Sequence, residues 1–165
     1  MVAPSYRLRI LIVVALLIGL FSAWWHFPSA TRLIADDSIA SVFAEAETWE
    51  VLSLEPWKGD FHGHRVLDRT TIGDEDVKRS LVRAFNRSTR GWHNFHMMCF
   101  NPRHVLSATD SGGRRVDLLI CFECLSYKAL ENGKAKLPGG QIRGTLAAEF
   151  NRIYGELGLK VASTD

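Results

Sequence analysis

The sequence lacks the motifs of the common hydrolases and nucleotide-binding enzymes. It contains no G-x-S-x-G, no H-E-x-x-H and no phosphate-binding glycine loop. It also lacks a long basic tract, and a net charge of +2 over 165 residues gives no electrostatic reason to bind nucleic acid. Internal repeats and low-complexity segments are absent too. We therefore expect no nucleic-acid partner, and no catalytic residue is identified by a known motif.

A long apolar run near the N-terminus indicates a membrane anchor. Residues 10–27 are almost wholly apolar and uncharged, and about 17–25 such residues span a bilayer. Arg7 and Arg9 precede the run, which favours a cytoplasmic N-terminus, and Trp24 and Trp25 suit the far interface. A cleaved signal peptide would look similar, but the small residues that cleavage needs are poorly placed. Whether the segment is cleaved stays open, and both alternatives export the rest of the chain.

The exported part is expected to form one domain, since about 130 residues are enough for a hydrophobic core without disulfides. The predicted location is the inner cell membrane, with a single pass and a periplasmic C-terminal domain. The expected layout is a cytoplasmic N-terminus (1–9), an anchor (10–27), a linker (28–35), an exported domain (36–160) and a frayed tail (161–165).

Apolar periodicity predicts an α+β fold. Helical spacing predicts three helices, which begin near Asp36, after Gly73 and at a capping Thr145. On the second helix we expect one solvated side, made of Lys78, Arg79, Arg83 and Arg87. Four strands are predicted, at 48–54, 65–72, 97–108 and 116–127. Because the strands come in pairs, we expect a small antiparallel sheet of about four strands with helices on one face.

The last two predicted strands form a hairpin whose register stays open. They flank the turn-forming segment Thr109–Arg114, which contains two glycines. A loop with an odd number of residues would give the better apolar face, with His104 and Leu106 against Leu118. A loop with an even number would place Cys99 nearly opposite Cys124. A bulge at Pro102 could change the parity partway along the hairpin.

All three cysteines lie at this hairpin. Residues three apart in a regular strand point to opposite faces, so Cys121 and Cys124 should not bridge unless a turn or bulge breaks the strand. Because an exported compartment favours oxidation, we expect a disulfide between Cys99 and Cys124, with Cys121 left free. The alternative is a metal site of Cys99, His104, Cys121 and Cys124, a legitimate ligand set for zinc or another transition metal. Otherwise we expect no cofactor.

Two histidine pairs are weaker candidates for metal ligands. His62 and His64 lie in a loop with Asp60, and His93 and His96 precede the hairpin. Ordinary polar loops explain both pairs more simply. A redox C-x-x-C of the thioredoxin type is disfavoured, because such motifs begin a helix and Glu123 here would raise the thiol pKa.

The motif C-F-N-P-R-H at Cys99–His104, together with V-D-L-L-I-C-F-E-C at Val116–Cys124, resembles uncharacterised bacterial membrane-anchored or lipoprotein-like proteins. The resemblance implies no activity, but it draws attention to Pro102 and Arg103 beside the cysteines. The sequence thus predicts a non-catalytic interaction or envelope-structural protein, with the membrane and an envelope protein as partners. The alternative hypothesis is a metal-binding or thiol-redox protein that uses the four residues named above.

Overall fold

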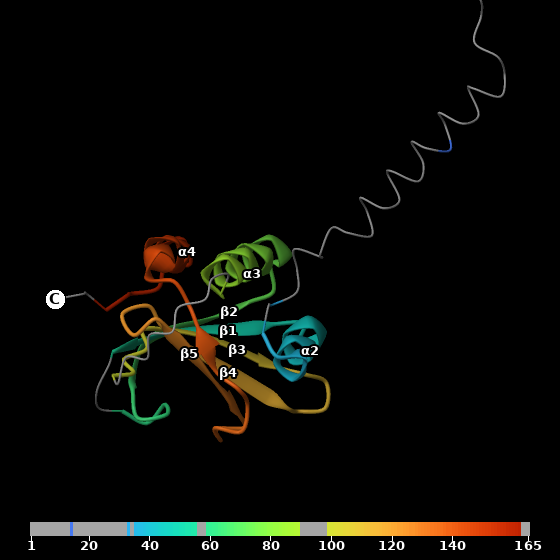
Figure 1. The fold of residues 1–165 in the computed structure, drawn as a ribbon, viewed down its shortest axis with the longest axis horizontal. Helices are drawn as coiled ribbons and strands as arrows, with labels where there is room; N and C mark the ends of the chain where they lie inside the picture. The colour runs from blue at the N-terminus through green and yellow to red at the C-terminus, as the bar shows by residue number, and fades with distance from the viewer. Residues whose placement is uncertain (1–13, 15–32, 34, 56–58, 90–98, 163–165) are drawn as a thin grey trace, which may run out of the picture. The chain divides into compact units, whose positions relative to one another are not determined.

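The computed structural model describes Val14, Leu33 and residues 35–55, 59–89 and 99–162, and it shows an α+β fold (Figure 1). The described strands form one antiparallel sheet in the order β2-β1-β3-β4-β5-β6. They are β1 (Trp49–Glu55), β2 (Arg65–Ile72), β3 (His104–Thr109), β4 (Arg115–Cys121), β5 (Ser126–Glu131) and β6 (Gly140–Gln141). The described helices are α2 (Asp37–Glu45), α3 (Glu75–Thr89) and α4 (Ala147–Glu156), with a 3-10 turn η1 (Gly144–Leu146). The α+β class and the antiparallel sheet are confirmed, with six strands where about four were predicted.

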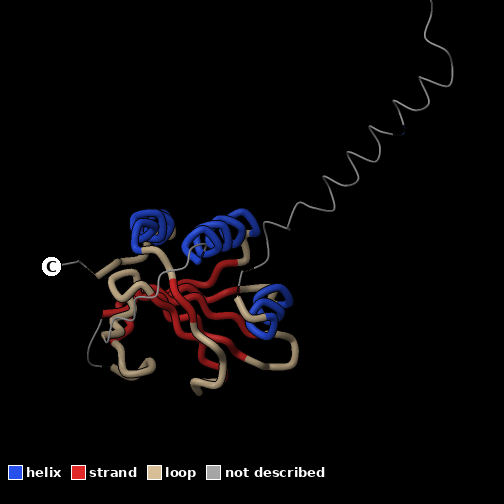
Figure 2. Tube along the Cα trace, viewed as in Figure 1, coloured by secondary structure: helices blue, strands red, loops and turns tan. Residues whose placement is uncertain are grey.

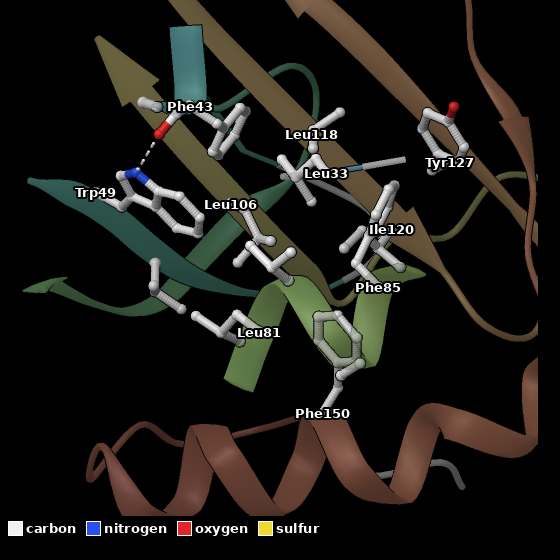
Figure 3. Packing of buried hydrophobic residues seen from close by; sticks show 14 of the residues in the cluster. Leu33, Phe43, Trp49, Leu81, Phe85, Leu106, Leu118, Ile120, Tyr127 and Phe150 are labelled. Carbon is white, nitrogen blue, oxygen red and sulfur yellow. Dashed lines mark hydrogen bonds between the residues drawn. The ribbon is translucent and has the colours of Figure 1, made fainter. Parts of the chain in front are cut away.

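The three helices pack against the same face of the sheet. In Figures 1 and 2, α3 and α4 lie side by side, and α2 lies near the β3–β4 connection. Figure 3 shows labelled residues of the three helices and of the sheet gathered in one cluster. The main core contains Phe43 of α2, Phe85 of α3 and Phe150 of α4, together with Leu106 and Leu118 of the sheet. Helix α2 begins where predicted, because the Asp36 side chain accepts a hydrogen bond from the Ser38 amide.

The hairpin of β3 and β4 has the odd register. Leu106 pairs with Leu118 and His104 pairs with Ile120, so these four side chains face the helices. The turn is closed by Asp110, whose Oδ1 accepts hydrogen bonds from the amides of Gly112 and Arg114 at 2.9 Å each. This is the chemistry for which Asp is favoured in turns.

The predicted strand at 116–127 is wrong in one respect: it is two strands. Strand β4 ends at Cys121, a turn occupies residues 122–125, and β5 returns from Ser126 with Cys121 and Ser126 paired. Leu125 has a φ of 52°. Leucine rarely adopts this left-handed conformation, so the sequence does not indicate a turn here. Phe122 and Cys124 continue the period-2 apolar pattern of β4 into the turn, which is why the sequence does not show where the strand ends. The predicted loop at 131–144 likewise contains the short strand β6.

Two smaller predictions about helices are also wrong. Lys78 is buried rather than solvated, because its Nζ reaches the carbonyl oxygens of Ala46 and Glu47 at the end of α2. Thr145 does not cap α4 but lies within the 3-10 turn that precedes it. The predicted stop at Gly158 is confirmed, since this residue has a φ of 76° and follows the last turn.

The opposite face of the sheet carries a second, smaller core. Its buried members are Leu52, Leu54, Val105, Leu119 and Leu130, with Phe61, Val66 and Phe100 packed against them. A tight turn at His62-Gly63, in which both residues have positive φ, brings Phe61 and His64 together as a β-bridge. These residues lie beside the second core, so this face of the sheet is not bare.

No helix among the described residues is long and apolar enough to cross a membrane. Of the predicted anchor at 10–27, only Val14 is among those residues. The pair His93 and His96 lies outside them as well.

Candidate functional site

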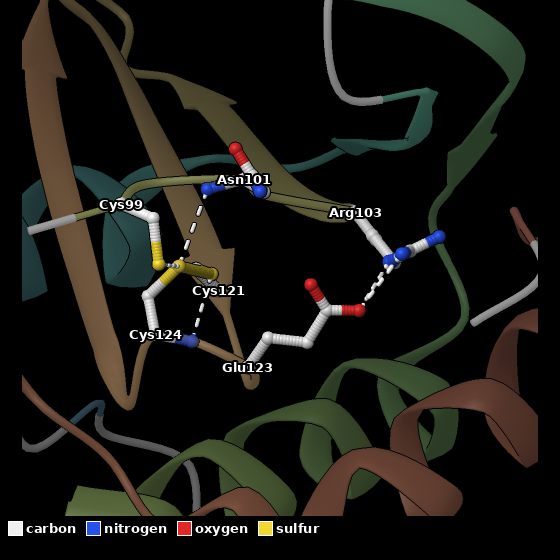
Figure 4. Close-up of a disulfide and its surroundings, with 6 residues drawn as sticks. All are labelled: Cys99, Asn101, Arg103, Cys121, Glu123 and Cys124. Carbon is white, nitrogen blue, oxygen red and sulfur yellow. Dashed lines mark hydrogen bonds and ion pairs between the residues drawn. A yellow bond between two sulfur atoms is a disulfide. The ribbon is translucent and has the colours of Figure 1, made fainter. Parts of the chain in front are cut away.

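The strongest candidate site is the turn between β4 and β5, where Cys121 and Cys124 form a disulfide (Figure 4). Their Cα atoms are 5.2 Å apart, a separation that suits a disulfide. The expected bridge between Cys99 and Cys124 is therefore wrong. Strand parity forbids a C-x-x-C bridge only inside a regular strand, and here the strand ends at the first cysteine. The turn brings the second cysteine back beside the first.

The third cysteine lies against this disulfide. Cys99 is a free, exposed thiol, and its Sγ is 3.5 Å from the Sγ of Cys124. The two residues are thus neighbours, as the sequence predicted, but they are not bonded. Cys124 is the residue whose sulfur contacts both others, as Figure 4 shows.

Backbone amides point at two of the sulfur atoms. The amide of Cys124 donates to the Sγ of Cys121 at 3.1 Å, and the amide of Asn101 donates to the Sγ of Cys124 at 3.3 Å. A hydrogen bond from an amide stabilises the charged form of an acidic group. Each bonded sulfur therefore has a donor in place for the thiolate that would form if the disulfide opened.

Arg103 and Pro102 hold the segment that carries Cys99. Pro102 is buried. The Arg103 amide donates to the Ile120 carbonyl at 3.3 Å, and the Arg103 carbonyl accepts from the Leu54 amide at 2.9 Å. The Arg103 guanidinium also binds Glu123, with Nη2 at 2.8 Å and Nε at 3.1 Å. The negative charge between the two cysteines of the C-x-x-C is therefore offset by a fixed positive charge.

His104 is not part of this cluster. It faces the helices, where its ring packs edge-on against Tyr154 at 4.7 Å and its Nε2 lies 2.8 Å from Oδ1 of Asn151. Cys121 follows Leu119 with period two, so it points to the opposite face of the sheet. The structure thus brings the three cysteines of the predicted metal set together but places His104 elsewhere. Among the described residues, no group of three or more histidine, cysteine or acidic side chains is arranged for a metal ion.

Burial shapes the chemistry of His104. It lowers the pKa of His104 from 6.5 to about 4, because a charged ring would lose its hydration there. The Nδ1 of His104 is buried and has no hydrogen-bond partner. The hydroxyl of Ser53, the residue opposite His104 in the β1–β3 pairing, is also buried without a hydrogen bond. The ring is therefore neutral at ordinary pH and serves the core.

A cluster of polar side chains lies around Asp117, on the face of the sheet opposite the three helices. This carboxylate is buried and accepts from Ser107 Oγ at 2.5 Å and from Arg115 Nε at 2.8 Å. Its Oδ2 lies 2.9 Å from the Nε2 of His62. The carboxylate beside His62 is therefore Asp117 rather than the predicted Asp60. The sequence offered one signal, since Ser107 and Asp117 are directly opposite in the odd register.

His64 does not join the contact between His62 and Asp117. Burial lowers the pKa of His64, and the nearby charges of His62 and Lys128 add to that effect. Its Nδ1 is buried without a partner. The pair therefore belongs to a turn that packs over the second core.

No family model, curated protein or solved structure matches the chain.

Proposed function

We propose that the chain is a membrane-anchored, exported protein whose domain exchanges thiols and disulfides through Cys99, Cys121 and Cys124. The 3.5 Å contact between the free Cys99 sulfur and the Cys124 end of the disulfide carries this proposal. A disulfide that only stabilises a fold needs no third sulfur in contact with it. Exchange does need one, because a thiolate must approach one of the two bonded sulfur atoms.

The surroundings of the sulfur atoms support the same chemistry. The C-x-x-C does not begin a helix, so no helix dipole is available to lower the thiol pKa. Two backbone amides donate to the sulfur atoms instead, and the ion pair with Arg103 offsets the charge of Glu123. Glu123 alone would disfavour a thiolate beside it, and its ion pair with Arg103 reduces that effect.

The apolar run at 10–27, with Arg7 and Arg9 before it, favours an anchor that exports residues 36–160. An exported compartment allows disulfides to form and persist. Protease treatment of intact spheroplasts tests this location: digestion of residues 36–160 is expected, and protection of those residues would overturn it.

Redox titration of the full-length protein in detergent micelles tests the activity. The protein is equilibrated with mixtures of reduced and oxidised dithiothreitol, and free thiols are alkylated and counted by mass spectrometry. We expect a reversible transition between one free thiol and three while the circular dichroism spectrum stays that of the folded protein. A disulfide that is lost only when the protein unfolds would refute an exchange function.

A non-catalytic role in interaction or envelope structure is the second candidate. The observation in its favour is that Cys121 and Cys124 are each only 1% exposed, as a purely structural disulfide would be. The same titration separates the two candidates, because a structural disulfide stays closed in the folded protein.

A further inference from the structure

The three sulfur atoms differ sharply in their access to solvent. Cys121 and Cys124 are each 1% exposed, whereas Cys99 is exposed. An external thiol must touch the sulfur that it attacks, so the rate of exchange depends on access. The buried pair cannot meet an external thiol directly in the folded state, and Cys99 can.

From this difference we infer that Cys99 is the residue through which external thiols reach the disulfide, by way of an internal exchange that moves the bridge. This inference rests on the proposed function and adds the order of the steps. Cys99 gives its proton to water, and its thiolate attacks the Sγ of Cys124, which lies 3.5 Å away. The Cys99–Cys124 bond forms, the Cys121–Cys124 bond breaks, and Cys121 leaves as a thiolate that takes a proton from water. No oxidant is needed, because the number of disulfides is unchanged.

The internal step is helped by the amide of Cys124, which donates to the Sγ of Cys121 at 3.1 Å. Cys121 is the leaving group of this step, and a thiolate leaves faster when its pKa is lower. The donor is part of the turn at 122–125 and is in place before the bond breaks. The turn at 122–125 thus brings the two bonded cysteines together and also supplies the amide that stabilises the leaving thiolate of Cys121.

The moved bridge is open to an external dithiol. One thiolate of the dithiol attacks the exposed Sγ of Cys99, the Cys99–Cys124 bond breaks, and Cys124 leaves as a thiolate that accepts from the Asn101 amide. The second thiolate of the dithiol then attacks the mixed disulfide and releases Cys99. The dithiol is oxidised to a disulfide, and Cys121 and Cys124 end as two thiols. The partner class is therefore a dithiol, whether a small molecule or a cysteine pair of another exported chain.

Arg103 is the positioning residue for this route. Its backbone bonds to Ile120 and Leu54 hold the segment behind Cys99 to two strands, and its side chain holds Glu123 of the turn. Both sides of the sulfur contact are thus tied to the same residue. These contacts of Arg103 hold Cys99 beside Cys124 in the folded protein.

The test compares the full-length protein with the Cys99→Ser and Cys121→Ser variants in detergent micelles. Reduced dithiothreitol is the small dithiol, and a reduced, unfolded ribonuclease is the protein dithiol. We expect Cys99→Ser to lose its disulfide about tenfold more slowly, or slower still, than the wild type while folded, because its bridge is buried. In urea the two proteins should react at the same rate. A rate difference with the ribonuclease but none with dithiothreitol would overturn the inference for small dithiols and keep it for protein thiols.

The Cys121→Ser variant checks the moved bridge directly. With oxidised glutathione present, it is expected to form the Cys99–Cys124 disulfide, identified by peptide mapping after acid quenching. Two free thiols in this variant would overturn the inference, as would a Cys99→Ser variant that reacts as fast as the wild type. In the latter case exchange would stand for Cys121 and Cys124 without Cys99, since the buried pair would be reached by another route. A wild-type protein whose bridge never opens while folded would remove both.

Discussion

Acid should destabilise the domain chiefly through His104. His104 is buried against Tyr154 and Phe150, and burial lowers its pKa from 6.5 to about 4. As the pH falls below 6.5, the unfolded chain binds a proton at this histidine before the folded chain does. Stability from the neutral ring is therefore complete above pH 6.5 and is lost progressively down to about pH 4.

The size of the effect follows from the two pKa values of His104. A tenfold difference in proton affinity corresponds to about 1.4 kcal/mol, so the change from 6.5 to about 4 amounts to about 3 kcal/mol. That is a large part of the stability of a small domain, which is about 5–15 kcal/mol. The pKa of His64 is lowered as well, so a smaller contribution of the same sign is expected from the second core.

Urea unfolding of residues 31–165, which form one compact unit, measures the effect. The free energy of unfolding is determined between pH 7 and pH 4 for the wild type and for His104→Gln, which keeps a polar side chain but does not titrate. We expect a shallow slope in the variant and a steep one in the wild type. Equal slopes in the two proteins would refute the reasoning, and so would a wild type whose stability does not change over this range.

Two further predictions concern backbone and charge. A Cβ on Gly139 would lie 2.5 Å from the carbonyl oxygen of Tyr127, so Gly139→Ala should lower the free energy of unfolding by about 1–3 kcal/mol. Gly155 has open space around it, so Gly155→Ala should raise the free energy of unfolding by about 0.5–1 kcal/mol. Equal effects of the two variants in thermal unfolding would contradict this contrast. Lys78→Met should cost about 1–3 kcal/mol, because two carbonyl oxygens at the end of α2 lose a charged donor. The control Arg83→Met changes an exposed residue of the same helix, and a loss of similar size there would contradict the role of Lys78.

Periodicity predicted those parts of the fold in which a pattern stays within one element. The strand Arg65–Ile72 has the predicted bounds, and α2 begins after the predicted acidic cap at Asp36. The hairpin register was narrowed to two alternatives, and the odd one holds because it buries Leu106 and Leu118 together. In each case one face is buried, so local residues carry enough information to fix the element.

Long-range partners were not predictable in the same way. Lys78 lies on a helix side with three arginines, and only the end of α2, distant in sequence, explains why it is buried. Asp117 is one polar residue in an apolar run, and its partner His62 comes from a turn more than fifty positions away. Neither contact leaves a periodic trace, so tertiary structure overrides the local preference.

A local pattern also fails at the cysteines, where the predicted Cys99–Cys124 bridge is wrong and Cys121 and Cys124 are bonded instead. The apolar alternation of Val116, Leu118 and Ile120 runs on through Phe122 and Cys124, so the sequence does not mark the end of β4, and the phase changes only in β5, where Tyr127 pairs with Ile120. Read as one strand, the run from Val116 to Tyr127 separates Cys121 from Cys124; folded as two, it joins them. Because Cys124 is bonded to Cys121, Cys99 is left as a free thiol. Its Sγ lies 3.5 Å from the Sγ of Cys124. A bonded pair and an exposed thiol in contact with it are the two components that disulfide exchange requires, and the turn at 122–125 brings them together.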